Sequence, residues 1–170
     1  MSPSTKPKRL VFSTPEPVRT SPPSSFRPRI AFARDGSLGS EKGAAASPRI
    51  LVVEDDFLVA DQMESLLQNA GFTVAAVVAS AEDAIKVAAE QKIDLAIMDI
   101  RLSGQRDGID AALELYRTLQ IRCLFATAHS DPAIQKRAEA ARPLGWLQKP
   151  YSMASLLQSV RNAIQVLDKN

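Results

Sequence analysis

Five short apolar segments, each followed by a helical pattern, constrain the fold of this chain more than any other feature. They lie at residues 49–53, 72–78, 94–98, 122–126 and 146–148. The first, Arg49-Ile50-Leu51-Val52-Val53, is apolar and rich in β-branched residues, which is typical of a strand buried on both faces. Strict alternation of strands and helices with short connections predicts a doubly wound α/β domain, in which helices cover both faces of a parallel sheet.

Polar residues mark the expected starts of the helices between these strands. The expected N-caps are Asp56, Ser80, Asp131 and Ser152. Gly108 is predicted to begin the third helix. The residues of that helix expected to face inward are Ile109, Ala112, Leu113 and Tyr116. Together these elements place one domain over residues 48–170.

Residues 1–47 differ in composition from the rest of the chain. They hold seven of the eleven prolines, which break helices and central strands. Eight Lys/Arg against three Asp/Glu give this segment a net charge of +5, whereas residues 48–170 carry −3. We expect a disordered, basic Pro/Ser-rich tail and linker that acts as a spacer. Contact with nucleic acid or an acidic membrane, a transit peptide, and a translation start further along the chain are the alternatives.

The composition also excludes several classes of protein. No apolar run approaches the ~20 residues of a membrane span, and the N-terminus lacks the apolar stretch of a secretory signal. A single cysteine, Cys123, and a single histidine, His129, exclude an internal disulfide and a zinc cluster. The acidic balance of residues 48–170 argues against a nucleic-acid-binding domain there. We therefore expect a cytoplasmic protein.

Polar residues follow four of the five predicted strands where each one ends. They are Glu54 and Asp55 after the first strand, Asp99 after the third, Thr127 after the fourth and Lys149 after the fifth. In a doubly wound sheet, binding sites lie beyond the carboxyl ends of the strands. A small cluster of acids with only oxygen ligands favours Mg²⁺, which also relieves the repulsion between the carboxylates. Asp99 can then act as a nucleophile toward a phosphoryl group, whose oxygens Lys149 and Thr127 can contact.

This ordered set of residues resembles the receiver domain of two-component response regulators. The residues that carry the resemblance are Glu54-Asp55, Asp99, Thr127-Ala128 and Lys149-Pro150. The resemblance covers residues 49–167. It implies a flavodoxin-like fold, with a five-stranded parallel sheet in the order 2-1-3-4-5 and five helices.

The resemblance also implies the role of each site residue. Asp99 would accept a phosphoryl group from the histidine of a kinase or of a phosphotransfer protein, and Lys149 would contact that group. Glu54, Asp55, Asp99 and the backbone carbonyl of Arg101 would hold Mg²⁺. Such a chain is a phosphoacceptor signalling protein that catalyses its own phosphorylation, and it is not a turnover enzyme.

Receivers of this family change their partners when they are phosphorylated. Thr127 would turn inward and the aromatic Trp146 would follow it. The face formed by the fourth helix, the fifth strand and the fifth helix would then contact a downstream protein or a second copy of the chain. Only three residues follow Leu167, so we expect a single-domain regulator without a DNA-binding output domain. Its signal would leave by protein contact or by phosphoryl relay.

Several positions depart from the usual pattern of the family. Ser103 stands where a proline is usual, four residues after Asp99, and Trp146 stands where Tyr or Phe is usual. The segment Phe125-Ala126-Thr127 resembles the alphaproteobacterial single-domain receivers with a Phe-Ala-Thr-Gly motif, although Ala128 replaces the glycine. Arg101 places a long cation beside Asp99, where we expect it to slow hydrolysis of the aspartyl phosphate.

Two other classes of function remain open. The first is a receiver-like binding module that contacts its partner without phosphorylation. The second is an enzyme of similar topology, such as a Mg²⁺-dependent phosphatase or a flavin protein. A phosphatase of this kind needs a second acid two residues after the nucleophile, where this chain has Arg101. The acids at Glu54-Asp55-Asp56 would repel the phosphate of a flavin or a nucleotide.

Overall fold

The computed structural model describes residues 29–30, 47–128 and 131–169. The parallel strands are β2 (Arg49–Val53), β3 (Thr73–Val78), β4 (Leu95–Asp99), β5 (Arg122–Thr127) and β6 (Gly145–Gln148). The helices are α1 (Phe57–Asn69), α2 (Ala81–Glu90), α3 (Gly108–Leu119), α4 (Pro132–Ala138) and α5 (Met153–Leu167), with the 3₁₀ helix η1 (Glu139–Ala141) after α4. The predicted alternation of strand and helix is confirmed. None of the helices in these ranges combines the length and the apolar character that crossing a membrane requires.

The parallel strands lie in the order β3-β2-β4-β5-β6, which is the expected order 2-1-3-4-5. A sixth strand, β1 (Arg29–Ile30), pairs antiparallel with β3 at the edge of the sheet. The structure differs here from the disordered tail that the sequence predicts. The sequence does not indicate this strand, because pairing with an open sheet edge uses backbone groups and needs no apolar pattern. The rest of the predicted tail, residues 1–28 and 31–46, lies outside the described residues, as does His129.

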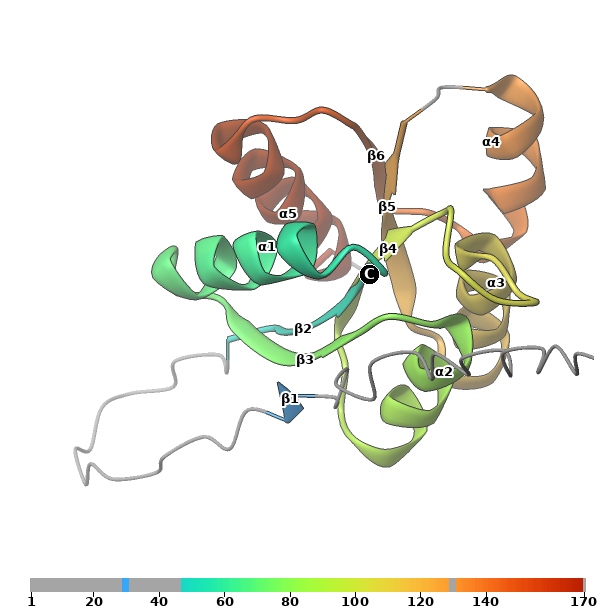
Figure 1. Cartoon of the computed structure of the whole chain (residues 1–170), viewed down its shortest axis with the longest axis horizontal. Coiled ribbons are helices and arrows are strands. Elements are labelled where there is room, and N and C mark those ends of the chain that lie inside the picture. The colour runs from blue at the N-terminus through green and yellow to red at the C-terminus, as the bar shows by residue number, and fades with distance from the viewer. Residues whose placement is uncertain (1–28, 31–46, 129–130, 170) are drawn as a thin grey trace, which may run out of the picture.

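The helices divide into two layers around the sheet (Figure 1). Helices α1 and α5 cover one face, and α2, α3 and α4 cover the other. Alternate residues of β2 serve the two layers: Ile50 and Val52 pack under α1 and α5, whereas Leu51 and Val53 pack under α2 and α3. These β2 side chains are all fully buried, as expected of a strand covered on both faces.

The N-caps predicted for four helices are confirmed, because the side chains of Asp56, Ser80, Asp131 and Ser152 each accept a hydrogen bond from a backbone N–H of the first turn. The buried residues of helix α3 differ in part from those that the sequence predicts to face inward. Ala111 and Leu115 are fully buried there, whereas Leu113 and Tyr116 are only half-buried. The reason is that α3 packs against α2 and η1 as well as against the sheet, so its buried arc is wider than one stripe.

Candidate functional site

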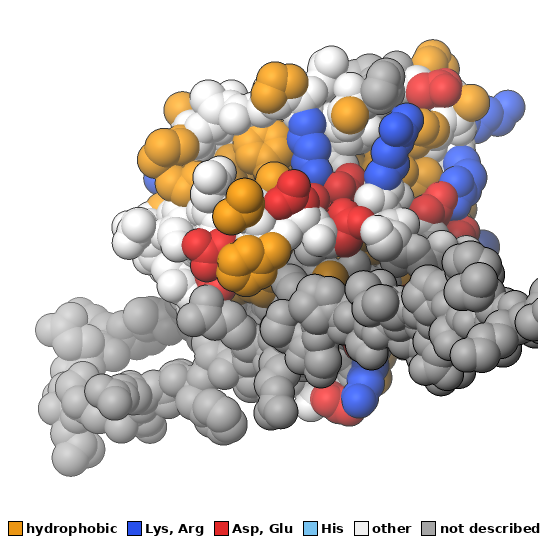
Figure 2. All heavy atoms as spheres, viewed as in Figure 1, with side chains coloured by type: hydrophobic (Ala, Val, Ile, Leu, Met, Phe, Trp, Pro, Cys, Tyr) orange, Lys and Arg blue, Asp and Glu red, His pale blue; other side chains and the backbone are white. Residues whose placement is uncertain are grey.

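The carboxyl ends of β2 and β4 bring three acids together. Glu54 and Asp55 follow β2 directly, Asp99 is the last residue of β4, and the two strands are neighbours in the sheet. One carboxylate oxygen from each acid lies within 4.8 Å of the others. Glu54 and Asp99 are buried, with 2% and 8% of their surface exposed, and Asp55 is half-buried. Acidic side chains also gather near the centre of the face in Figure 2, beside basic ones.

Lys149, directly after β6, joins two of these acids. Its Nζ donates hydrogen bonds to Glu54 Oε2 at 2.6 Å and to Asp99 Oδ2 at 2.8 Å. Burial raises the pKa of Glu54, and the hydrogen bond from Lys149 opposes this rise without cancelling it. Burial alone would lower the pKa of Lys149, but its hydrogen bonds to Asp99 and Glu54 outweigh that effect and the pKa is raised. The ammonium is therefore held in its charged form between the two carboxylates.

The acid cluster fits a hard divalent cation. Its three carboxylates offer only oxygen ligands, and one lysine ammonium is too little positive charge to balance all three. The backbone N–H of Arg101 donates to Asp99 Oδ1 at 3.1 Å, and its side chain is exposed. Glu54, Asp55 and Asp99 could thus hold a divalent cation, and ligation of Mg²⁺ by these acids and by the Arg101 carbonyl stays a prediction.

Thr127 lies at the same edge of the sheet. It is the last residue of β5 and is 6% exposed. Asp99 pairs with Ala126 across the β4–β5 ladder, so Thr127 is one residue beyond the level of Asp99. Its backbone carbonyl accepts a hydrogen bond from the Lys149 N–H at 2.7 Å. The ends of β5 and β6 are therefore joined beside the acid cluster.

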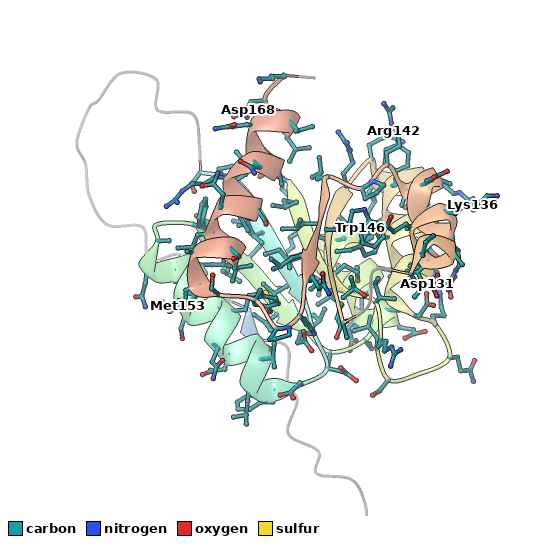
Figure 3. All side chains as sticks on the ribbon, turned by 90° about the horizontal axis from the view of Figure 1, so that it is seen from above. Asp131, Lys136, Arg142, Trp146, Met153 and Asp168 are labelled. Atoms are coloured by element: carbon teal, nitrogen blue, oxygen red, sulfur yellow. The ribbon has the colours of Figure 1, made fainter. Side chains whose placement is uncertain are left out.

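Trp146, the predicted switch residue, lies three residues before Lys149 in β6. Its ring stacks on Phe125, with the ring centroids 4.9 Å apart and the planes inclined by 23°. The side chain is half-buried and packs against the core cluster that contains Ala138 and Ala141, on the α4 side of the sheet (Figure 3). The structure does not bring Trp146 into the acid cluster, and its role as a switch stays a prediction.

Two residues of this region have roles that sequence reasoning did not assign. A Cβ added at Gly108 would lie 1.9 Å from the backbone oxygen of Asp99, so α3 begins in direct contact with the strand end that carries this acid. Ser103 donates two hydrogen bonds to Asp55. The glycine that opens α3 is the only sequence signal of the first contact. The contact between Ser103 and Asp55 joins residues far apart in the chain, so no local sequence pattern indicates it.

An ion pair joins α4 to the beginning of α3. Arg137 Nη2 donates to Asp107 Oδ1 at 2.5 Å and to Asp110 Oδ1 at 3.0 Å. Asp107 is the N-cap of α3 and forms a capping box with Asp110. Burial alone would raise the pKa of Asp107, but hydrogen bonds from Arg137 and from the backbone outweigh it and the pKa is lowered below 3.8.

We expect Arg137→Gln to lower the free energy of unfolding by about 1 kcal/mol at neutral pH, because both carboxylates are partly exposed and water screens the pair. A carboxyl whose native pKa is lowered stabilises the fold above its unfolded pKa and loses that contribution as the pH falls. The difference from wild type should therefore shrink as the pH falls below 3.8, the ordinary pKa of Asp107. Urea unfolding across this range measures it, with Lys136→Gln as the control. An equal loss at neutral and acid pH would contradict the pairing.

The fold and the acid cluster are those expected of a receiver domain, and comparison with known proteins agrees. The family model of the response regulator receiver domain matches residues 50–161. This chain therefore belongs to the response regulator receiver family, whose members act in two-component signalling.

Relatives and solved structures give the same assignment. The transcriptional regulatory protein PdtaR of Mycobacterium tuberculosis is 30% identical over 74% of this chain and 60% of its own length. The regulator PhyR of Methylorubrum extorquens is 29% identical over 74% of this chain and 47% of its own length, so the chain spans about half of such relatives. The receiver domain of a modulated diguanylate cyclase from Desulfovibrio desulfuricans is 31% identical, with a TM-score of 0.66 over 72% of this chain and 97% of that one. A CheY-like receiver from Methanospirillum hungatei, 20% identical, shares the fold with a TM-score of 0.68 over 73% and 98% of the two chains.

Proposed function

We propose that Asp99 is the phosphoacceptor of this receiver. Its carboxylate attacks the phosphorus of a phosphohistidine on a kinase or phosphotransfer protein. The phosphorus–nitrogen bond breaks, and the imidazole of the donor keeps the electron pair. The observation that carries this proposal is the placement of Asp99, which lies at a strand end beside Glu54 and Asp55 and is held by the Lys149 ammonium at 2.8 Å.

Each neighbour of Asp99 has a task in this step. Mg²⁺ held by Glu54, Asp55 and Asp99, with the Arg101 carbonyl as a further ligand, would neutralise charge on the phosphoryl oxygens. Lys149 leaves its hydrogen bond with Asp99 and pairs with one phosphoryl oxygen. The Thr127 hydroxyl donates to another. In this proposal the protein itself supplies the groups that catalyse its phosphorylation, and it does not turn over a substrate.

Acetyl phosphate tests this proposal without a named kinase. We expect the wild-type protein to incorporate phosphate in the presence of Mg²⁺, and Asp99→Ala to incorporate none, because the nucleophile is missing. Asp168→Ala, at the exposed end of α5, is the control and should behave as wild type. Phosphate incorporation is measured from the intact mass of the protein. Equal incorporation by the Asp99 variant, or none by wild type, would reject the proposal, and the second result would favour the phosphorylation-independent binding module.

We propose in addition that the signal leaves through the surface formed by α4, β6 and α5. Trp146 supports this proposal, because its half-buried ring connects β6 with the core beneath α4 and η1. The signal would then leave by contact with a partner protein or with a second copy of the chain. Phosphoryl relay is the other route in this proposal, which takes the protein to be a single-domain regulator in the cytoplasm. A partner that bound equally with and without phosphorylation would contradict this part of the proposal.

A further inference from the structure

The loop between β4 and α3 is attached to the acid cluster at Ser103. The backbone N–H of Ser103 donates to Asp55 Oδ2 at 3.0 Å, and its hydroxyl donates to the same oxygen at 2.5 Å. Ser103 is exposed and Asp55 is half-buried. These two bonds therefore join the end of β2 to the loop that follows Asp99.

Both donors reach Oδ2, which leaves Asp55 Oδ1 available to a cation. Hydrogen bonds to a carboxylate are charge-assisted and are stronger than bonds between neutral groups. Two of them on one oxygen fix the plane of the carboxylate before any ion arrives. Within residues 47–128 and 131–169, no other side chain or backbone group donates a hydrogen bond to Asp55.

The serine is what makes this arrangement possible. A proline, which is usual at this position in the family that the sequence resembles, has neither a backbone N–H nor a hydroxyl. It could form neither of the two bonds. Gly104, the next residue, adopts a φ of 138°, a conformation that side chains rarely take and that helps the loop turn here.

We propose that Ser103 is a positioning residue for the Mg²⁺ site, acting through Asp55. By holding Asp55 in one orientation, it removes part of the entropy that the carboxylate would otherwise lose when the ion binds. Hydrogen-bond partners of metal ligands commonly change metal affinity by about 10-fold or more. This inference rests on the proposed function, because it assumes that Asp55 is a ligand of the ion.

Isothermal titration calorimetry tests this role by measuring the affinity of the unphosphorylated full chain for Mg²⁺ alone. We expect Ser103→Ala, which keeps the N–H and removes the hydroxyl, to weaken binding by about 10-fold. Ser103→Thr, which restores a hydroxyl, should recover most of the affinity. Gln105→Ala is the matched control, because Gln105 is exposed in the same loop, and it should bind as wild type. Ser103→Ala also removes a hydrogen bond that the metal-free protein makes, so its free energy of unfolding in EDTA should fall slightly, and Ser103→Thr should recover this loss as well.

The variant Asp55→Asn separates this inference from the proposed function. If Asp55→Asn binds Mg²⁺ as tightly as wild type, or wild type binds none, the metal site itself is wrong. If Asp55→Asn loses the ion while Ser103→Ala keeps wild-type affinity, the site stands and the role of Ser103 is overturned. An affinity loss in Ser103→Ala that Ser103→Thr does not recover would also overturn it.

Discussion

Replacing Gly108 by alanine is expected to lower the free energy of unfolding by about 3 kcal/mol or more. The added Cβ would lie 1.9 Å from the backbone oxygen of Asp99 and 2.9 Å from its backbone carbon. Neither atom belongs to a flexible side chain, so the first turn of α3 must move away from the end of β4. The same movement would stretch the hydrogen bond from the Gly108 N–H to the Ile100 carbonyl, now 3.0 Å.

Urea unfolding measures this effect, and Gly145→Ala is the matched control. A Cβ at Gly145 would lie 3.3 Å from Leu124 Cδ1, the end of a side chain that can shift, so only a small loss is expected there. Because Gly108 contacts Asp99, the proposed phosphoacceptor, Gly108→Ala should also incorporate less phosphate from acetyl phosphate. Wild-type stability in Gly108→Ala would contradict the close packing of α3 on β4.

Replacing Lys149 by methionine is the second change with a large expected effect. Methionine has a similar length and no charge, so Glu54 and Asp99 lose the ammonium that neutralises them while they remain buried. Removing one partner of a buried ion pair costs about 3 kcal/mol of stability. The loss should be largest at neutral pH. It should shrink at acid pH, because burial already raises the pKa of Glu54 and protonation removes the unpaired charge.

Thermal and urea unfolding with and without Mg²⁺ measure this prediction. Mg²⁺ should stabilise Lys149→Met more than it stabilises wild type, since the ion replaces part of the missing positive charge. Lys86→Met, an exposed position on α2, serves as the control and should change stability little. If Lys149→Met were as stable as wild type without divalent ions, the carboxylates would not form the charged cluster described above.

The acid cluster could be predicted because buried parallel strands are continuous apolar runs, and a polar residue directly follows the last apolar one. Val53 is followed by Glu54, and Met98 by Asp99, so the point where each strand leaves the core is visible without a structure. Parallel pairing of β2 and β4 then brings these ends together. The placement of Lys149 beside the acids follows from the same pattern, whereas the sheet order is implied by the resemblance to the receiver family that these residues carry.

Contacts made by loops and by helix flanks could not be predicted in this way. The bonds of Ser103 to Asp55 and of Arg137 to Asp107 join positions that no periodicity relates. The stripe assigned to α3 omitted Ala111 and Leu115, because contacts with the neighbouring α2 and η1, and not the sheet alone, decide which of its residues are buried. The strand β1 (Arg29–Ile30) depends on backbone pairing with β3, which has no signature in side-chain pattern.

Locating the phosphoryl group in the wild-type protein tests the central claim most directly. After incubation with acetyl phosphate and Mg²⁺, the protein is digested under conditions that preserve acyl phosphates, and the modified peptide is sequenced by mass spectrometry. Our account predicts that the phosphoryl group is found on Asp99, because its buried carboxylate is the one held between Lys149 and the acid pair. A phosphoryl group on Asp55, on Ser103 or on any other residue, with Asp99 unmodified, would contradict it.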